Sequence, residues 1–262
     1  MNSATILLFG LITVLFAELP CSAANLVPNG DFEQGARGSP AHWTSPDNLT
    51  SFWSNDGVDG RCIRFDTDVY REEWEAHRET PEKPVRKTPT RGKKYNTVAG
   101  SAGVKMWSEP IRVEPGGIYR MQADVKGPGG EPFVYLKGFR RCSAREAERR
   151  GTLRFFHRNP KGPAFSLMVG GDEKRPAREG DYLQVFRKRL VCRVPKSGNW
   201  RRFSQPVQIP DNRYRATVIM LMLYAYWPPG DYYFDNIVFR RIDKAEAAKI
   251  RRNRRNDGVP VP

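Results

Sequence analysis

The feature that most constrains this chain is the alternation of apolar and polar residues in short segments bounded by glycine and proline. Residues 118–126 (IYRMQADVK) alternate in this way between the turn sequences PGG at 115–117 and GPGG at 127–130. Successive side chains of a β-strand point to opposite faces, so the pattern predicts a strand with one buried face. Such a face needs a second layer to pack against, which favours a layered β-protein.

Several further segments have the same character, and 23 glycines and 21 prolines supply turns between them. We expect a strand at 132–139 that forms an antiparallel hairpin with 118–126. The other expected strands are 25–32, 60–66, 105–113, 203–209, 217–226 and 232–241. Because no helices alternate with these strands, the sequence predicts an all-β fold, an antiparallel β-sandwich.

Two stretches interrupt the strand pattern. Residues 71–94 are dense in charge and proline, and we interpret them as a solvated excursion with a helical turn at 72–78. Residues 141–189 form a second insertion, with a helix at 143–150 and a polar loop at 170–180. The expected organisation is a signal peptide at 1–24, one sandwich domain at 25–242, and a basic tail at 243–262 that begins with a short helix.

The amino terminus predicts export. Residues 6–17 (ILLFGLITVLFA) are uninterruptedly apolar, and such a run is shorter than the ~20 residues that span a bilayer. Small residues follow at 22–24, so we expect cleavage after Ala23 or Ala24 and a secreted protein, extracellular or periplasmic. No other segment could span a membrane. A lipid anchor on Cys21 is the alternative, and the preceding Glu18-Leu19-Pro20 disfavours it.

Three cysteines remain after cleavage, Cys62, Cys142 and Cys192. Export permits a disulfide, and we expect Cys142 to pair with Cys192 because both fall just outside apolar, strand-like segments. That bond would close a loop of about 50 residues and contribute up to ~4 kcal/mol. The alternative is three reduced, half-buried thiols.

The chain is strongly basic, with 44 Lys and Arg against 29 Asp and Glu, a net charge of +15. Much of the excess lies in a carboxy-terminal stretch at 240–255. Export makes nucleic acid an unexpected partner, whereas an acidic polysaccharide or an anionic cell envelope remains an alternative to a merely solvated tail. The three histidines argue against a His-rich metal site.

Motifs in a fixed order suggest a family. The segment NLVPNGDFE at 25–33, followed by Trp43, resembles the opening strand of the galactose-binding-like jelly roll. Later motifs that fit the same pattern are GRCIRF at 60–65, WSEPI at 107–111 with VEPG at 113–116, the pair Trp200 and Phe203, and YYFDNIVF at 232–239. The chain thus resembles carbohydrate-binding modules of families 4, 9 and 22 over 25–242, the two insertions apart. The resemblance implies a jelly roll that recognises a polysaccharide or glycan.

The same resemblance implies a structural calcium ion that joins the first strand to the last. Glu33 and Asp235 match the family's ligands, with backbone carbonyls nearby. Calcium takes 6–8 oxygen ligands, and two carboxylates would offset its charge. The alternative is that Glu33 is a solvated turn residue and that Asp235 caps a strand end.

Sugar binding in such modules uses aromatic rings with polar neighbours. Tyr224 and Tyr226 fall on the face of strand 217–226 opposite its buried set. If the expected hairpin lies beside that strand, Tyr135 joins them on a concave surface with Gln122 and Arg120. The alternative is that these tyrosines pack beneath the insertions.

The sequence therefore predicts a secreted, non-catalytic protein that resembles a carbohydrate-binding module. The alternatives are a jelly-roll glycoside hydrolase or polysaccharide lyase, or a basic envelope-associated protein that binds acidic polysaccharide. Glycoside hydrolysis needs two carboxyl groups that flank the bond, and no pair stands out. The histidines lie in loop-like segments, so the Tyr/His chemistry of the lyases is not visible either, and we assign no catalytic residue.

Overall fold

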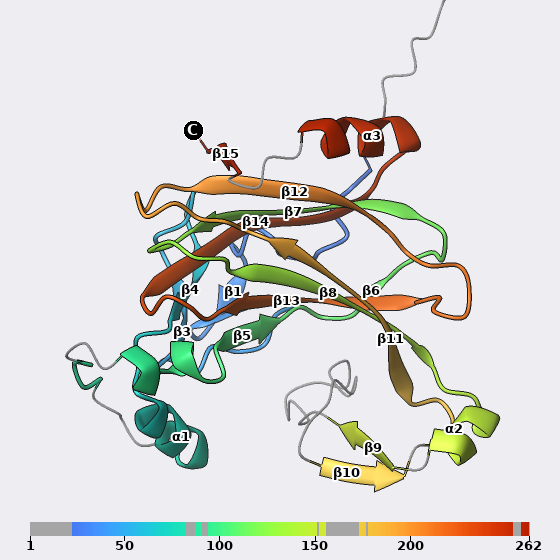
Figure 1. Ribbon diagram of the computed structural model, residues 1–262, viewed down its shortest axis with the longest axis horizontal. Helices are drawn as coiled ribbons and strands as arrows, with labels where there is room; N and C mark the ends of the chain where they lie inside the picture. The colour runs from blue at the N-terminus through green and yellow to red at the C-terminus, as the bar shows by residue number, and fades with distance from the viewer. Residues whose placement is uncertain are drawn as a thin grey trace, which may run out of the picture.

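Two antiparallel sheets form the two layers of the protein (Figure 1). The computed structural model describes residues 23–81, 87–90, 94–150, 152–155, 173–176, 178–253 and 258–261. In spatial order, the six-stranded sheet consists of β15 (Val259–Pro260), β12 (Arg201–Gln208), β7 (Ile118–Lys126), β14 (Asp231–Arg241), β4 (Cys62–Asp66) and β3 (Ser51–Ser54). The predicted antiparallel β-sandwich is confirmed.

The five-stranded sheet forms the second layer, and it carries the candidate site. In order, its strands are β11 (Tyr182–Val191), β8 (Phe133–Arg141), β13 (Val218–Ala225) and β5 (Val104–Trp107), with β6 (Ile111–Arg112) also paired to β13. Two small hairpins pair outside the two sheets, β1 (Gly35–Ala36) with β2 (Ser39–Pro40), and β9 (Thr152–Phe155) with β10 (Glu173–Pro176). The helices are α1 (Arg71–Glu79), α2 (Ala144–Arg150) and α3 (Lys244–Asn253), with 3-10 turns at Lys94–Asn96 and Val98–Gly100.

The core lies between the two sheets and follows the alternation seen in the sequence. On β8, Val134 and Leu136 are fully buried in it, and on β13 so are Ile219, Leu221 and Leu223. From the opposite layer, alternate residues of β7 complete the packing, from Tyr119 to Val125. Burying one such side chain contributes ~1.5–3 kcal/mol, so each strand is committed to one orientation. The buried face expected for 217–226 is confirmed.

The expected hairpin between 118–126 and 132–139 is wrong. Strand β7 pairs with β12 and β14, whereas β8 pairs with β11 and β13 in the other sheet. The linker between them contains Gly129 and Gly130 with φ of 112° and 84°, conformations open to glycine. It carries the chain from one layer to the other. A turn-rich linker between two alternating segments suits a hairpin and a crossing between layers equally well.

The amino-terminal segment lies along the last strand, as the sequence predicts, although it is not a regular strand. The Leu26 amide donates to the Phe239 carbonyl at 2.8 Å, and the Ile237 amide donates to the Gly30 carbonyl at 2.7 Å. At Gly30 a Cβ atom would lie 2.1 Å from the Ile237 carbonyl oxygen, so only glycine fits this approach. Positive φ angles at Asn29 and Phe32, 51° and 59°, interrupt the extended backbone.

Both insertions contain the predicted helices, but the second insertion is shorter than expected. Helix α1 lies in the first, and α2 opens the second. Residues from Tyr182 onward belong instead to β11, an edge strand of the five-stranded sheet. Its sequence, YLQVFRKRLV, carries several cations toward its end, and these obscure the apolar alternation.

The predicted disulfide between Cys142 and Cys192 is wrong. The two residues follow β8 and β11, which pair antiparallel with Tyr182 opposite Arg141 and Val191 opposite Phe133. The cysteines therefore lie at opposite ends of the strand pair, roughly 30 Å apart at ~3.4 Å per residue, and no bond joins them. Burial raises the pKa of the Cys192 thiol, which keeps it protonated.

The structure describes most of the carboxy-terminal end of the chain, whereas residues 1–22 lie outside the described residues. The apolar run at 6–17 lies outside the described residues, so export stays a prediction. Within the described ranges, no helix combines the length and the apolar character needed to cross a membrane. At the other end, α3 takes the place of the predicted short helix and lies over β12 and β7 on the outer side of the six-stranded sheet (Figure 1).

One ion pair on that outer side joins three strands. Asp124 of β7 is fully buried and accepts two hydrogen bonds of 2.7 Å from the guanidinium of Arg202 on β12. The side-chain amide of Asn236 on β14 donates to the same carboxylate at 3.1 Å. Because the carboxylate has no access to water, it depends on these donors.

Replacement of Arg202 by methionine should therefore destabilise the fold. We expect Arg202→Met to lower the free energy of unfolding by roughly 3 kcal/mol, the lower end for a broken buried pair, because the Arg202 side chain is itself 41% exposed. Urea denaturation measures the change. The control is Arg193→Met, which breaks the exposed pair with Glu131 and should cost under about 1 kcal/mol. Equal losses in the two variants would contradict the prediction.

Candidate functional site

Four aromatic side chains meet on the outer face of the five-stranded sheet. They are Phe133 and Tyr135 on β8, Tyr224 on β13 and Tyr226 just beyond it, and we name them the aromatic cluster. The ring centroids of Tyr224 and Tyr226 are 5.7 Å apart, and those of Tyr135 and Tyr224 are 6.0 Å apart. The predicted grouping of the three tyrosines is thus what the structure shows.

The cluster arises directly from strand register. Val134 and Leu136 face the core, so Phe133, Tyr135 and Lys137 between and beside them face outward. On β13, Tyr224 lies opposite Phe133 in the pairing with β8. The planes of Phe133 and Tyr224 differ by only 8°. Phe133, Tyr224 and Tyr226 therefore form a nearly parallel set of rings, with angles between their planes of 8° to 23°. The ring of Tyr135 is tilted by 64° against that of Tyr224.

The rings are held in place rather than loosely exposed. Phe133 is 6% exposed beneath the three half-buried tyrosines. The Tyr224 hydroxyl donates to the Ala102 carbonyl at 3.2 Å, and a Cβ atom at Gly103 would lie 2.7 Å from its ring. Burial and the two neighbouring tyrosines raise the pKa of Tyr224, so its hydroxyl stays protonated at neutral pH.

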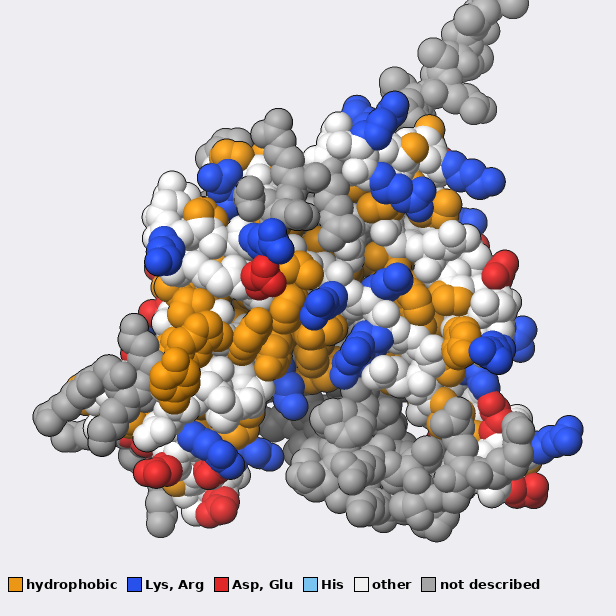
Figure 2. Space-filling view, in the orientation of Figure 1, with side chains coloured by type: hydrophobic (Ala, Val, Ile, Leu, Met, Phe, Trp, Pro, Cys, Tyr) orange, Lys and Arg blue, Asp and Glu red, His pale blue; other side chains and the backbone are white. Residues whose placement is uncertain are grey.

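Cationic side chains lie beside the rings on the same face. Arg189 of β11 pairs opposite Tyr135, and its guanidinium carbon lies 5.0 Å from the Phe133 ring centroid. Lys137 follows Tyr135 on the outward face, with its Nζ 4.7 Å from the Trp107 ring centroid. Figure 2 shows hydrophobic side chains gathered over the neighbouring ends of β8 and β13, with Lys and Arg side chains next to them.

The two polar residues predicted to share this surface do not. Arg120 and Gln122 both belong to β7 in the other sheet, where Arg120 donates a hydrogen bond to Gln122 and lies 3.7 Å from the Glu246 carboxylate of α3. This error follows from the wrong hairpin. Phe133 and Arg189 were not among the site residues predicted from the sequence. Phe133 could have been found from its spacing to Tyr135, whereas Arg189 was hidden in the presumed insertion.

The predicted calcium ligands lie close to one short loop. The Asp235 carboxylate accepts hydrogen bonds from the amides of Asn236 at 2.6 Å and Val58 at 2.7 Å, and Glu33 accepts one from the amide of Arg61 at 2.6 Å. Glu33 therefore joins the loop between β3 and β4 to the amino-terminal segment, and Asp235 joins the same loop to β14. The pKa of Asp235 is raised to about 6, first by burial and further by the charges of Asp124 and Glu33.

These residues fit calcium in charge and in donor chemistry. Oxygen ligands suit the ion, and a cation would offset the charges of Asp124 and Glu33, which add to burial in raising the pKa of Asp235. Among the described residues, no group of three acidic, histidine or cysteine side chains comes together. Main-chain carbonyls would have to supply the remaining ligands. A structural calcium ion that joins Glu33 to β14 stays a prediction.

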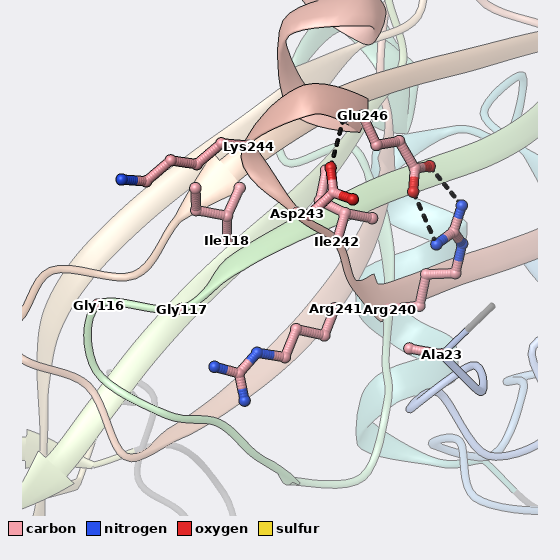
Figure 3. Close-up of a pocket in the computed structure, with 10 residues that line it drawn as sticks. All are labelled: Ala23, Gly116, Gly117, Ile118, Arg240, Arg241, Ile242, Asp243, Lys244 and Glu246. Atoms are coloured by element: carbon pink, nitrogen blue, oxygen red, sulfur yellow. Dashed lines mark hydrogen bonds and ion pairs between the residues drawn. The ribbon is translucent and has the colours of Figure 1, made fainter. Parts of the chain in front are cut away.

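A cavity of about 770 Å³ lies elsewhere, between the turn at 116–117, the end of β14 and the start of α3 (Figure 3). Both arginines that line it are paired with carboxylates. Figure 3 shows the guanidinium of Arg240 against the carboxylate of Glu246, with a hydrogen bond of 3.1 Å, and the Glu246 amide donates to Asp243 at 2.7 Å. Arg241 pairs with Glu114. These contacts fasten α3 to the sheet and favour a structural role.

Comparison with known proteins gives structural likeness only. No family model and no curated protein match the chain. A family 16 carbohydrate-binding module is 14% identical with a TM-score of 0.40, over 82% of this chain and 99% of that chain. A putative sugar-binding protein from Bacteroides thetaiotaomicron is 10% identical with a TM-score of 0.41, over 84% and 100%.

The enzymatically active domain of tailspike protein 4 from bacteriophage CBA120 is 11% identical with a TM-score of 0.42, over 83% of this chain. This chain spans only 21% of that protein. Carbohydrate-binding modules are thus among the solved structures to which the chain is similar. At such low identity, binding residues must be judged from this chain's own side chains.

Calcium should stabilise the protein if Glu33 and Asp235 hold it. We expect the melting temperature of EDTA-treated protein to rise on addition of calcium chloride, because the ion offsets the carboxylate charge around Asp235. Glu33→Gln, which keeps an oxygen for the Arg61 amide, should reduce that rise. The control is Asp31→Asn in the same turn, where the carboxylate is exposed. A wild-type melting temperature that calcium leaves unchanged would remove the site.

Proposed function

We propose that the protein binds a polysaccharide or glycan chain on the outer face of the five-stranded sheet, at the aromatic cluster, without cleaving it. The observation that carries this proposal is the set of half-buried tyrosines gathered on one sheet face, Tyr135, Tyr224 and Tyr226. Aromatic rings offer a flat apolar surface for the C–H groups of a pyranose ring, and neighbouring polar groups orient the hydroxyls.

The rigidity of the cluster supports binding. Phe133 supports the tyrosines from below, and the Tyr224 hydroxyl is held by the Ala102 carbonyl. A surface that is ordered before the ligand arrives loses little conformational entropy on binding. The hydroxyls of Tyr135 and Tyr226 and the guanidinium of the nearby Arg189 also supply hydrogen-bond donors toward sugar oxygens.

The residues around the cluster favour binding over hydrolysis. None of the strands β5, β6, β8, β11 and β13 contains an aspartate or a glutamate. Glycosidases place two carboxyl groups on either side of the scissile bond, ~5–9.5 Å apart, and these strands supply neither. The sheet therefore lacks the side chains that hydrolysis needs.

The histidines give equally little support to a lyase. His42 Nδ1 lies 2.9 Å from a Glu109 oxygen, and His77 Nε2 lies 2.8 Å from the Asp47 carbonyl. Neither partner belongs to the aromatic cluster, and His157 lies outside the described residues. The raised pKa of Tyr224 also makes that hydroxyl a poor base.

Export of the protein, directed by the apolar segment at 6–17, is part of the proposal, and it rests on the sequence alone.

Removal of a tyrosine from the cluster should weaken glycan binding. We expect Tyr135→Ala and Tyr224→Ala each to lower affinity about fivefold to tenfold, because a lost stacking contact is worth ~1 kcal/mol. Affinity electrophoresis against neutral and acidic polysaccharides gives the measurement. The control is Tyr214→Ala, which removes a 45% exposed ring from the loop before β13. Unchanged retention of folded Tyr135→Ala and Tyr224→Ala would refute the site.

The same polysaccharides test the absence of catalysis. After long incubation with the wild-type protein, we expect no new reducing ends and no ultraviolet absorbance from unsaturated uronates. Product formation that Tyr135→Ala or Tyr224→Ala abolishes would instead assign an enzymatic role to this face.

A further inference from the structure

The charge of the protein is divided unevenly between its two sheets. The strands of the five-stranded sheet contain lysine and arginine but no acidic residue, and these cations are Lys105, Arg112, Lys137, Arg140, Arg141, Arg187, Lys188 and Arg189. The six-stranded sheet carries carboxylates on three strands, namely Asp66, Asp124, Asp231 and Asp235. The layer with the aromatic cluster is therefore the basic layer.

Strand register brings part of this charge next to the rings. Arg189 lies opposite Tyr135, and Arg187 lies opposite Lys137. On the other side, Lys105 of β5 lies opposite Tyr224. Neighbouring strands are ~4.8 Å apart, and successive outward residues on one strand are ~7 Å apart. We name Lys105, Lys137, Arg187 and Arg189 the cation group, which thus borders the aromatic cluster within the reach of one sugar unit.

The cation group experiences repulsion within the fold. Burial first, and then the charges of Lys105 and Arg187, lower the pKa of Lys137 to about 8. Lys105 and Arg187, the two charged neighbours of Lys137 within the described part of the chain, are thus both cations. A bound anion would offset this repulsion and favour the protonated amine.

We infer that the glycan bound on this face is anionic, a polysaccharide with carboxylate or sulfate groups that contact Lys137, Arg187 and Arg189 while its sugar rings lie on Tyr135 and Tyr224. This inference rests on the proposed function of the aromatic cluster. Arginine binds carboxylate and sulfate oxygens with two parallel hydrogen bonds, and the contact of Arg189 with the Phe133 ring directs one guanidinium to the edge of the cluster.

The carboxy-terminal basic stretch is a weaker candidate for the same ligand. Arg240 is bound to Glu246 and Arg241 to Glu114, so two of its cations are already compensated. Its helix, α3, lies over the other sheet, away from the aromatic cluster. Arg251 and Arg252 on α3 are exposed, and they serve as a matched control of equal charge.

Three polymers test the inference. Polygalacturonate is the carboxylate probe, dextran sulfate is the sulfate probe, and dextran is the neutral probe. We expect Lys137→Gln/Arg187→Gln to lower affinity for the preferred anionic polymer at least tenfold and to flatten its dependence on salt. Arg251→Gln/Arg252→Gln should change the affinity by less than about twofold and should leave its dependence on salt as in the wild type. Circular dichroism and melting temperature establish that each variant is folded. A loss of equal size in the two double variants would overturn the inference, since it would indicate unspecific charge attraction.

Further outcomes separate this inference from the proposed function. If neutral glycans bind as tightly as anionic ones, and Tyr135→Ala weakens both, the inference fails and the aromatic site stands. If anionic polymers bind but Tyr135→Ala and Tyr224→Ala have no effect, the proposed function fails, and the inference fails with it. Preference for polygalacturonate assigns the carboxylate, and preference for dextran sulfate assigns the sulfate.

The dependence of the affinity for polygalacturonate on pH gives a second test. Of the residues that the structure describes, the ionisable groups beside Lys137 are Lys105, Arg187 and Arg189 on the flanking strands, and Tyr135 and Tyr224 in the cluster. The arginines stay charged, and the carboxylates of polygalacturonate stay ionised, between about pH 7 and about pH 9. Because Lys137 loses its proton near pH 8, affinity should fall over this interval.

Lys137→Arg should keep the affinity measured at pH 7 and abolish the decline, since arginine stays protonated throughout. A decline of the same size in Lys137→Arg as in the wild type would contradict the assignment of Lys137 to the anion.

Discussion

The packing of two sheets against a common core is the constraint on which the rest of the molecule depends. Val134, Leu136 and Leu223 must face inward, because each contributes ~1.5–3 kcal/mol when buried. A shift of one residue in register would exchange the two faces of a strand, so the inward set determines the outward one. Tyr135 and Tyr224 are presented on the surface for this reason, and the aromatic cluster inherits the rigidity of the core beneath it.

The two outer faces of the sandwich differ in how their charged side chains are arranged. On the six-stranded sheet, Asp124 is compensated by Arg202, and Arg240 by Glu246 of the helix above. Charges of both signs thus join strands to one another and fasten α3. On the five-stranded sheet, the strands carry cations alone, and Lys137 is held near Lys105 and Arg187. Like charges repel one another, which is why this face is the better candidate for binding an anionic ligand from outside.

Rings and cations on one face also define what kind of recognition is possible. The tyrosines offer apolar area with little conformational freedom to lose, and the arginines offer geometry that matches carboxylate or sulfate. Neither property requires a reaction, and the strands of this sheet contain no carboxyl group for acid or base chemistry. The calcium site suggested by Glu33 and Asp235 would act at a different place, where it would join the amino-terminal turn to β14 and leave the binding face unaffected.

Most of the strands, and the side of each strand that is buried, could be predicted from the sequence, because alternation in apolar character is a local property. The sequence also indicated that the amino-terminal segment lies along β14, and that Tyr135, Tyr224 and Tyr226 share a face. Only the tertiary structure decided which strands are neighbours. Main-chain hydrogen bonds join any two strands alike, so the linker at 127–130 could not reveal that β7 and β8 belong to different sheets. Arg120 and Gln122 were therefore assigned to the wrong face, and Arg189 and the separation of Cys142 from Cys192 became apparent only once β11 had taken its place at the sheet edge.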